Sequence, residues 1–255
     1  MRGSSSSEAV VVQPIEQEER RFVLVGSTPL IFNRMSEKAK RTLLIGGGRK
    51  SRAELESRMK HDPLAEYQAS IYRSTDEESP TRLVMPSPAF KGSLASAGVD
   101  MPGAAKAKLK RLSYVVGYSV PIFGIPELFM SVVRSADMAK TPDIRTRAIV
   151  REWVAMVAIR YVVPNLNATA MTNLLAAAGE IIGVGDFRQE KGAGDFGRFR
   201  IAHEDDADVQ RIVKAGGRLA QDEALESPEA FDAESAELWA FVEEQKRISG
   251  KRSAA

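Results

Sequence analysis

The sequence predicts an α+β protein built on an antiparallel sheet of the ferredoxin-like type, with helices on one face. Two observations predict this fold. Short β-branched segments and amphipathic segments follow one another in the order strand, helix, strand, and that order occurs twice. In addition, 44% of the 255 residues are apolar, which is enough to bury a core and excludes a disordered chain. We expect a tail at 1–19, a domain at 20–202 with a basic insertion at 34–80, and an acidic helical extension at 203–255.

The first half of the chain supplies the first unit. Residues 20–26 form a short segment that contains two β-branched valines and ends at Gly26, which predicts a strand, and residues 83–85 before Pro86 predict another. Ser87 and Pro88 form a helix start, with Ser87 as the capping residue and proline at the first helical position. We also expect a strand at 10–13, helices at 37–44, 53–60, 63–72 and 89–97, and a loop at 74–80.

The second half supplies the second unit. Residues 114–133 have strand and turn composition, and residues 149–163 predict one strand covered on both faces and ended by Pro164. Residues 168–182 form the clearest helix, because their apolar residues recur at helical spacing. Residues 183–202 return to strand and loop composition. From residue 209 the pattern is acidic and helical, and the last helix has an apolar stripe of Leu238, Phe241 and Val242.

Composition excludes several classes of site. There is no cysteine, which rules out disulfide scaffolds, thiolate zinc sites, iron–sulfur clusters and thiol catalysis. With only two histidines, His61 and His203, an imidazole-rich metal site is excluded, and we expect no cofactor. No segment reaches the roughly 18 uninterrupted apolar residues of a membrane span, and the first residues do not resemble a signal peptide. We therefore expect an intracellular protein without a membrane partner.

Charge is divided along the chain. Residues 1–203 hold 29 basic and 21 acidic residues, whereas residues 204–247 hold 5 basic and 13 acidic ones. The net charges of these parts are thus +8 and −8. One interpretation is two solvated faces, and the other is a basic surface for a polyanion with an acidic segment that contacts a neighbouring subunit.

The segment 183–200, GVGDFRQEKGAGDFGRFR, is the most informative. Five glycines in the fifteen positions 183–197 allow close backbone approach to a ligand, and the interleaved cations Arg188, Lys191 and Arg198 can meet phosphates. Phe187 could stack on a base, although the pattern favours a core position for any single phenylalanine here. The glycines follow a helix and precede a strand, which is the reverse of a dinucleotide-binding fingerprint, and no Gly-Lys-Ser/Thr closes a Walker loop.

Two further segments could contact phosphates. MPSPAFKGSL at 85–94 places Lys91 in the first turn of a helix, although a plain capped helix has the same pattern. Residues 34–60 hold nine basic and three acidic residues around a triple glycine, which is consistent either with a solvated helix pair or with a basic finger that orders on a polyanion. The candidate cations of this finger are Arg34, Lys38, Arg41, Arg49, Lys50 and Arg52.

Three motifs in this order, Gly26-Ser-Thr-Pro-Leu30, MPSPAFKGSL and the terminal helix running into GVGDFRQEKGAGDFGRFRI, resemble the RAMP superfamily over about residues 20–202. These ferredoxin-like (RRM-like) proteins form the backbone and repeat-processing subunits of CRISPR effector complexes, and the chain is also similar to phage-encoded relatives outside CRISPR. The resemblance implies single-stranded DNA or RNA binding by subunits arranged side by side in a helical filament, in the cytoplasm of a bacterial host. It implies backbone contacts by Arg34, Lys91, Arg188, Lys191 and Arg198, and leaves other subunits of a ribonucleoprotein or recombination complex as further partners.

Two alternatives remain open at this point. Some RAMP proteins cleave RNA with an aspartate in the loop after the first strand, but Ser27–Ser36 holds no carboxylate, so we expect no catalytic residue. A metal-independent endoribonuclease with His61 or His203 as general base is the first alternative. The second is a structural subunit in which the glycine-rich loop only packs against the edge of the sheet.

Overall fold

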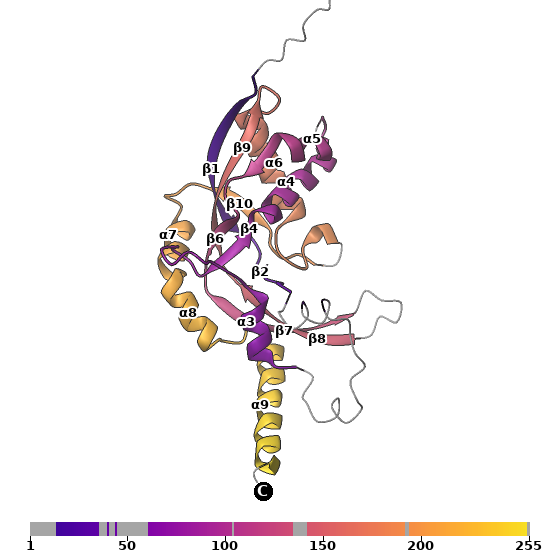
Figure 1. Cartoon of the computed structure of the whole chain (residues 1–255), viewed down its shortest axis with the longest axis vertical. Helices are drawn as coiled ribbons and strands as arrows, with labels where there is room; N and C mark the ends of the chain where they lie inside the picture. Colours follow the sequence, from indigo (N-terminus) through magenta and orange to yellow (C-terminus); the bar gives the residue numbers. More distant parts are fainter. Residues whose placement is uncertain are drawn as a thin grey trace, which may run out of the picture.

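Strand β1 (Glu16–Gly26) is the second strand from one edge of the larger sheet. The computed structural model describes residues 14–35, 40, 44, 61–103, 105–134, 142–191 and 194–253. Along its length β1 pairs with β9 (Val154–Val163), from Glu16 opposite Val163 to Val25 opposite Val154. On its other side the apolar end of β1 pairs with β10 (Phe199–Ala202). The molecule is long and narrow, with the sheet in its upper half and helix α9 (Ala233–Ser253) extending from the lower end (Figure 1).

The strand order confirms the ferredoxin-like fold. The order β10-β1-β9-β6 is antiparallel throughout. Along the chain the elements run β1, α4, β5 with β6, β9, α6 and β10, which is two interleaved strand–helix–strand units. The second strand of the fold is broken, since β5 and β6 both pair with β9. The remaining bounds of this unit are α4 (Ser87–Asp100), α5 (Lys106–Leu112), β5 (Ser113–Val115), β6 (Ser119–Phe123) and α6 (Ala168–Ala177).

Two insertions interrupt this unit, as expected. The first lies between β1 and α4, and its strand β4 extends the sheet beyond β6. The second is the hairpin of β7 and β8 between β6 and β9, which forms a separate sheet in the order β2-β8-β7. The bounds are β2 (Leu30–Ile31), α3 (Pro63–Ser70), β3 (Tyr72–Arg73), β4 (Leu83–Pro86), β7 (Pro126–Arg134) and β8 (Pro142–Val150).

The predicted single strand at 149–163 is wrong. It is the end of β8, a break at 151–153, and the whole of β9. Trp153 lies in the break and is completely buried. Its carbonyl accepts a hydrogen bond from the Gly26 amide at 2.8 Å, and its indole donates to the Thr28 carbonyl at 2.9 Å. An apolar run can therefore turn a corner between two sheets without a polar break, because the corner itself is buried.

The main core lies between the sheet and helices α4 and α6. Phe22 and Leu24 of β1 point to this side, together with alternate residues of β9. Helix α6 continues into one π-helical turn, Ala178–Ile182, so the predicted helix 168–182 has the expected bounds. Gly179 in that turn lies against Phe199 of β10, where a Cβ would be 2.1 Å from the Phe199 carbonyl oxygen. The helix consequently packs directly against the strand.

A helix of the C-terminal extension covers part of the opposite face of the sheet. Val209 and Ile212 of α7 (Ala207–Ala215) cover Val23 and Val25 on the opposite face of the sheet. The rest of this face is partly open, and Met156 is 43% exposed there. Helix α8 (Arg218–Glu226) follows α7 at the side of the molecule (Figure 1). Its Gln221 is completely buried and accepts hydrogen bonds from the Arg82 and Leu83 amides.

Three local predictions also need correction. Ser87 does not cap α4, because the helix begins at Ser87 itself and its N-cap is Pro86 without a side-chain bond. Phe241 does not belong to a buried stripe of α9, since it is 63% exposed. The predicted helix at 63–72 ends at Ser70. The predicted strand at 10–13 and helix at 53–60, and the helix at 37–44 except for Lys40 and Leu44, lie outside the described residues. No described helix has the length and hydrophobicity needed to cross a membrane.

Candidate nucleic-acid interface

The turn after β1 and the glycine-rich loop lie against each other, although about 170 residues separate them. The Ser27 amide donates to the Arg198 carbonyl at 2.8 Å, and the Gly197 amide donates to the Pro29 carbonyl at 2.8 Å. The Thr28 hydroxyl accepts a hydrogen bond from the Arg198 amide at 3.0 Å. Two of the three sequence motifs therefore form one structural unit at the ends of β1 and β10.

Two glycines of this loop allow chain segments to pass closely. Gly197 has a φ of +73°, and a Cβ there would lie 1.7 Å from the Val184 carbonyl oxygen. A Cβ on Gly194 would lie 1.7 Å from the Phe187 carbonyl oxygen. The amides of Val184 and Asp186 are also used within the protein, bonding Gly197 at 2.9 Å and Ile31 at 3.0 Å. These contacts stabilise the loop itself rather than presenting those amides to a ligand.

Asp186 connects the loop to the smaller sheet. Its carboxylate accepts hydrogen bonds from the side-chain amide of Asn33 (Nδ2) at 2.9 Å and from Arg147 Nη1 at 2.6 Å. Arg147 on β8 is 4% exposed, and it also donates to the Ser131 hydroxyl at 2.6 Å. Burial lowers the pKa of the Arg147 guanidinium, and the negative charge of Asp186 opposes this shift. Arg147 is thus a buried cation whose main counter-charge is Asp186.

A groove lies beside this unit, and we call it the Arg34 groove. It consists of two adjoining open hollows of about 540 Å³ each, and Arg34 lines both of them. The Arg34 amide donates to the Ser70 carbonyl at 2.7 Å, which fixes the position of the chain here. One hollow is lined by Tyr72, Arg73, Asp76, Pro86 and Tyr118, among others, and the other by Asn33, His61, Glu66, Asp143, Arg145 and Arg147, among others.

The groove contains aromatic and cationic side chains in the same place. Tyr118 is 98% exposed, which is unusual for a large aromatic residue in a folded domain. Arg145 is also exposed. Tyr118 follows Gly117, whose φ is +83°, in the turn that leads into β6. The groove also contains carboxylates, and its charge is therefore mixed rather than purely basic.

The predicted site residues are only partly brought together. Arg188 pairs with Glu190 at 2.6 Å, and Arg198 pairs with Glu180 and with Asp195. Lys91 has no ion pair with any residue that the structure describes. Phe187 is 43% exposed, with its ring centroid 6.0 Å from that of Phe196. Lys191 ends a short 3-10 turn, Gln189–Lys191, and the predicted cations Lys38, Arg41, Arg49, Lys50 and Arg52 lie outside the described residues.

Several groove residues were not predicted from the sequence. Arg73, Arg145 and Tyr118 stand alone among uncharged or mixed neighbours, so no local pattern marks them. Phe32, the aromatic residue just before Asn33 and Arg34, is completely buried and therefore cannot stack on a base.

The hollow that contains Asp143 and Arg145, which we call the lower hollow, also contains His61. Two carboxylates flank this histidine. Its Nδ1 is 2.9 Å from Glu66 and its Nε2 is 3.2 Å from Asp143. Each ring nitrogen thus faces a carboxylate of the protein. Because Glu66 belongs to α3 and Asp143 to β8, His61 connects these two elements. Within the described ranges, no group of three His, Asp, Glu or Cys side chains is placed to hold a metal ion.

No family model matches the sequence, and no curated protein matches it. Among solved structures the chain is similar to a chain of the cryo-EM structure of the type III-B Cmr-β bound to cognate target RNA, with 11% identity and a TM-score of 0.31. The match covers 72% of this chain and 60% of the other, so it spans less than two thirds of that protein's length. The ferredoxin-like assignment rests on the strand order and pairing described above.

Proposed function

We propose that this protein binds single-stranded nucleic acid in the Arg34 groove, without catalysis, and that copies assemble side by side along the strand. The observation that carries the proposal is that Arg34 and Arg73 line one hollow together with the exposed Tyr118, and that Arg34 and Arg145 line the adjoining hollow. Guanidinium groups bind phosphates, and an exposed aromatic ring stacks on any base. This combination suits a strand whose bases are unpaired.

The glycine-rich loop supports the groove in this proposal. Asp186 holds Asn33 next to Arg34, and it holds Arg147 in the wall of the lower hollow. The other predicted contacts, Lys91, Phe187, Arg188, Lys191 and Arg198, remain part of the proposal as a flank of the groove. For Arg188 and Arg198 this requires exchanging a surface carboxylate for a phosphate, which costs little because exposed ion pairs contribute only about 0–1 kcal/mol.

The test is fluorescence anisotropy with labelled 30-nucleotide single-stranded DNA, single-stranded RNA and duplex over a salt series. We expect tight binding to single strands, with log K falling by about 0.7 per phosphate contact for each tenfold rise in salt. Arg34→Ala should weaken binding and reduce the salt slope. Arg211→Ala is the matched control, because Arg211 is an exposed, ion-paired arginine on α7 that lines neither hollow. Absence of binding at about 50 mM salt would contradict the proposal.

The endoribonuclease alternative is less well supported. A general base needs an imidazole nitrogen that can reach the proton it removes, and both nitrogens of His61 face carboxylates. His203 is exposed and makes no side-chain hydrogen bond or ion pair with the described residues. Incubation with labelled RNA in EDTA, beside His61→Ala and His203→Ala, tests this alternative. Cleavage by the wild type that either substitution abolishes would establish it.

A further inference from the structure

Helix α9 presents an exposed face that is apolar at its centre and acidic at its edges. Phe241 is 63% exposed and Ile248 is 37% exposed, and residues seven apart lie on the same face of a helix. Glu237 and Glu244, four residues before and three after Phe241, lie on that face and are exposed. Glu244 forms an ion pair with Arg247 one turn later.

The other side of α9 attaches the helix to the body. The Ser235 hydroxyl is completely buried and accepts a hydrogen bond from the Met130 amide at 3.0 Å. Leu238 and Trp239 pack against the main core. Beyond this attachment the helix extends away from the body at the lower end of the molecule (Figure 1). The Phe241 face therefore lies on a helix that is anchored to the body and extends into solvent.

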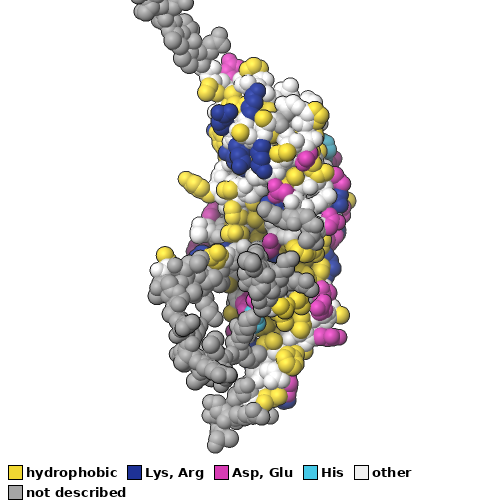
Figure 2. Space-filling model, turned by 90° about the vertical axis from the view of Figure 1, so that its right-hand side faces the viewer, with side chains coloured by type: hydrophobic (Ala, Val, Ile, Leu, Met, Phe, Trp, Pro, Cys, Tyr) yellow, Lys and Arg dark blue, Asp and Glu magenta, His cyan; other side chains and the backbone are white. Residues whose placement is uncertain are grey.

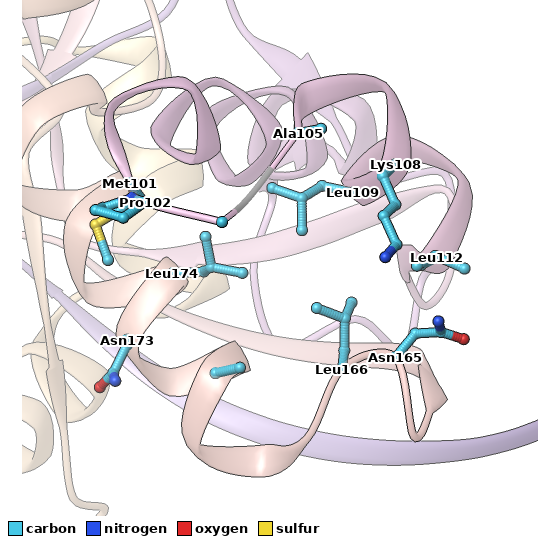
Figure 3. Close-up of a pocket in the computed structure, with 12 residues that line it drawn as sticks. Met101, Pro102, Ala105, Lys108, Leu109, Leu112, Asn165, Leu166, Asn173 and Leu174 are labelled. Carbon is cyan, nitrogen blue, oxygen red and sulfur yellow. The ribbon is translucent and has the colours of Figure 1, made fainter.

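The opposite end of the molecule carries a groove of complementary character. It lies between α5 and α6 and has a volume of about 250 Å³. Figure 3 shows Leu109, Leu166 and Leu174 pointing into this groove, with Lys108 at its edge. These three leucines are buried within the protein, and they form the apolar floor of a narrow groove beside the charged helix α5.

Helix α5 places positive charge along one side of this groove. Lys108, Lys110 and Arg111 are exposed and form no ion pair within the described part of the chain. Lys106 differs, because its ammonium donates to the Ser96 hydroxyl at 3.0 Å. Seen from the side on which α5 lies, Lys and Arg side chains gather near the upper end of the molecule (Figure 2).

We propose that the Phe241 face of α9 in one copy docks into the α5–α6 groove of a second copy. Phe241 would fill the apolar groove, while Glu237 and Glu244 would face Lys108 and Arg111, which lie three residues apart on the same side of α5. The two surfaces differ and lie at opposite ends of the molecule (Figure 1), so the contact is head-to-tail and leaves a free surface at each end of every assembly. The inference rests on the proposed assembly of copies along the strand and names the surfaces that would join neighbouring copies.

Two variants block the two sides of this contact separately. Phe241→Glu removes the α9 surface and keeps the groove, whereas the double variant Lys108→Glu/Arg111→Glu removes the positive charge beside the groove and keeps α9. All three substituted side chains are exposed, so folding should be unaffected. Leu219→Glu on α8 is the matched control, because it places the same charge on an apolar side chain that is 86% exposed elsewhere.

The measurement is sedimentation velocity without nucleic acid, from about 1 to 100 μM protein, a range in which weak specific contacts of micromolar affinity are populated. The wild type and Leu219→Glu should form oligomers larger than dimers. Each blocking variant alone should associate about 30-fold or more weakly, as expected for loss of an interface hot spot. An equimolar mixture of the two variants should form a dimer and stop there, since each copy keeps one complementary surface.

Three outcomes would overturn the inference. They are a wild type that stays monomeric throughout this range, a blocking variant that assembles like the wild type, and a mixture that does not pair. The proposed function fails separately, because Arg34→Ala should weaken nucleic-acid binding without changing self-association. Anisotropy with an oligonucleotide short enough for one subunit should give the same affinity for Phe241→Glu as for the wild type.

Discussion

Asp186 in the glycine-rich loop accepts a hydrogen bond at 2.6 Å from Arg147, a buried guanidinium on β8. The two residues are 39 positions apart. Arg147 belongs to the smaller sheet, whereas Asp186 lies in the loop that leads to β10 of the larger sheet. Through Asn33, the same carboxylate contacts the segment that carries Arg34. The ion pair thus couples the stability of the fold to the shape of the proposed groove.

Asp186→Ala should destabilise the protein by about 3 kcal/mol, because the substitution leaves the Arg147 charge buried without its partner. Urea unfolding followed by circular dichroism measures the change in the free energy of unfolding. Asp195→Ala is the control, since Asp195 is an exposed partner of Arg198 and its loss should cost less than about 1 kcal/mol. Equal effects of the two substitutions would show that Asp186 has no special role.

Gly197→Ala and Gly92→Ala should change stability in opposite directions. Gly197 has a φ of +73° and no room for a Cβ, so alanine there should cost at least about 2 kcal/mol. Gly92 lies within α4, and a Cβ there would meet no atom within 4 Å, so alanine should stabilise the helix by about 0.5–1 kcal/mol. Thermal unfolding of both variants beside the wild type checks the signs, and a stabilised Gly197→Ala would contradict the packing described for the loop.

Tyr118→Ala should weaken binding of single-stranded nucleic acid by about 1–3 kcal/mol if one base stacks on the ring. The ring is 98% exposed, so the stability of the fold should not change. Tyr118→Phe should bind as the wild type does, because stacking needs the ring and not the hydroxyl. Anisotropy at one salt concentration measures all three proteins. An unchanged affinity for Tyr118→Ala would remove this residue from the proposed interface.

Acid should weaken the attachment of α8. Arg82 donates to both carboxylate oxygens of Asp222, at 2.6 and 2.9 Å, and these hydrogen bonds hold the pKa of Asp222 below its usual value of 3.8. A carboxylate with a lowered pKa in the folded state stabilises the fold above its unfolded pKa, and this contribution is lost as the pH falls through the folded value.

The corresponding variant is Asp222→Asn. Urea unfolding should find the wild type more stable than the variant by no more than about 1 kcal/mol above pH 5, because the pair is partly exposed. The difference should shrink below about pH 4 as Asp222 takes up a proton in both states. A difference that is constant from pH 7 to pH 2 would contradict this assignment.

The sequence by itself determined the repeated strand–helix–strand order, the strand before Gly26, the helix at 168–182 and the charge division between 1–203 and 204–247. These features depend on hydrophobic periodicity and turn residues, which act over one element at a time. The turn after the first strand and the glycine-rich loop are two of the three motifs that carry the resemblance. In the structure these two segments are hydrogen-bonded to each other.

Only the tertiary structure decided which side chains meet. The break at Trp153 is invisible in an apolar run, because it is marked by burial against β1 and not by polarity. Phe32 and Phe241 are both aromatic residues in mixed surroundings, yet one is buried and the other exposed. The cations of the Arg34 groove come from separate strands and their flanking segments. Their proximity follows from how the two sheets and α3 pack, and contacts between residues so distant in sequence leave no local pattern.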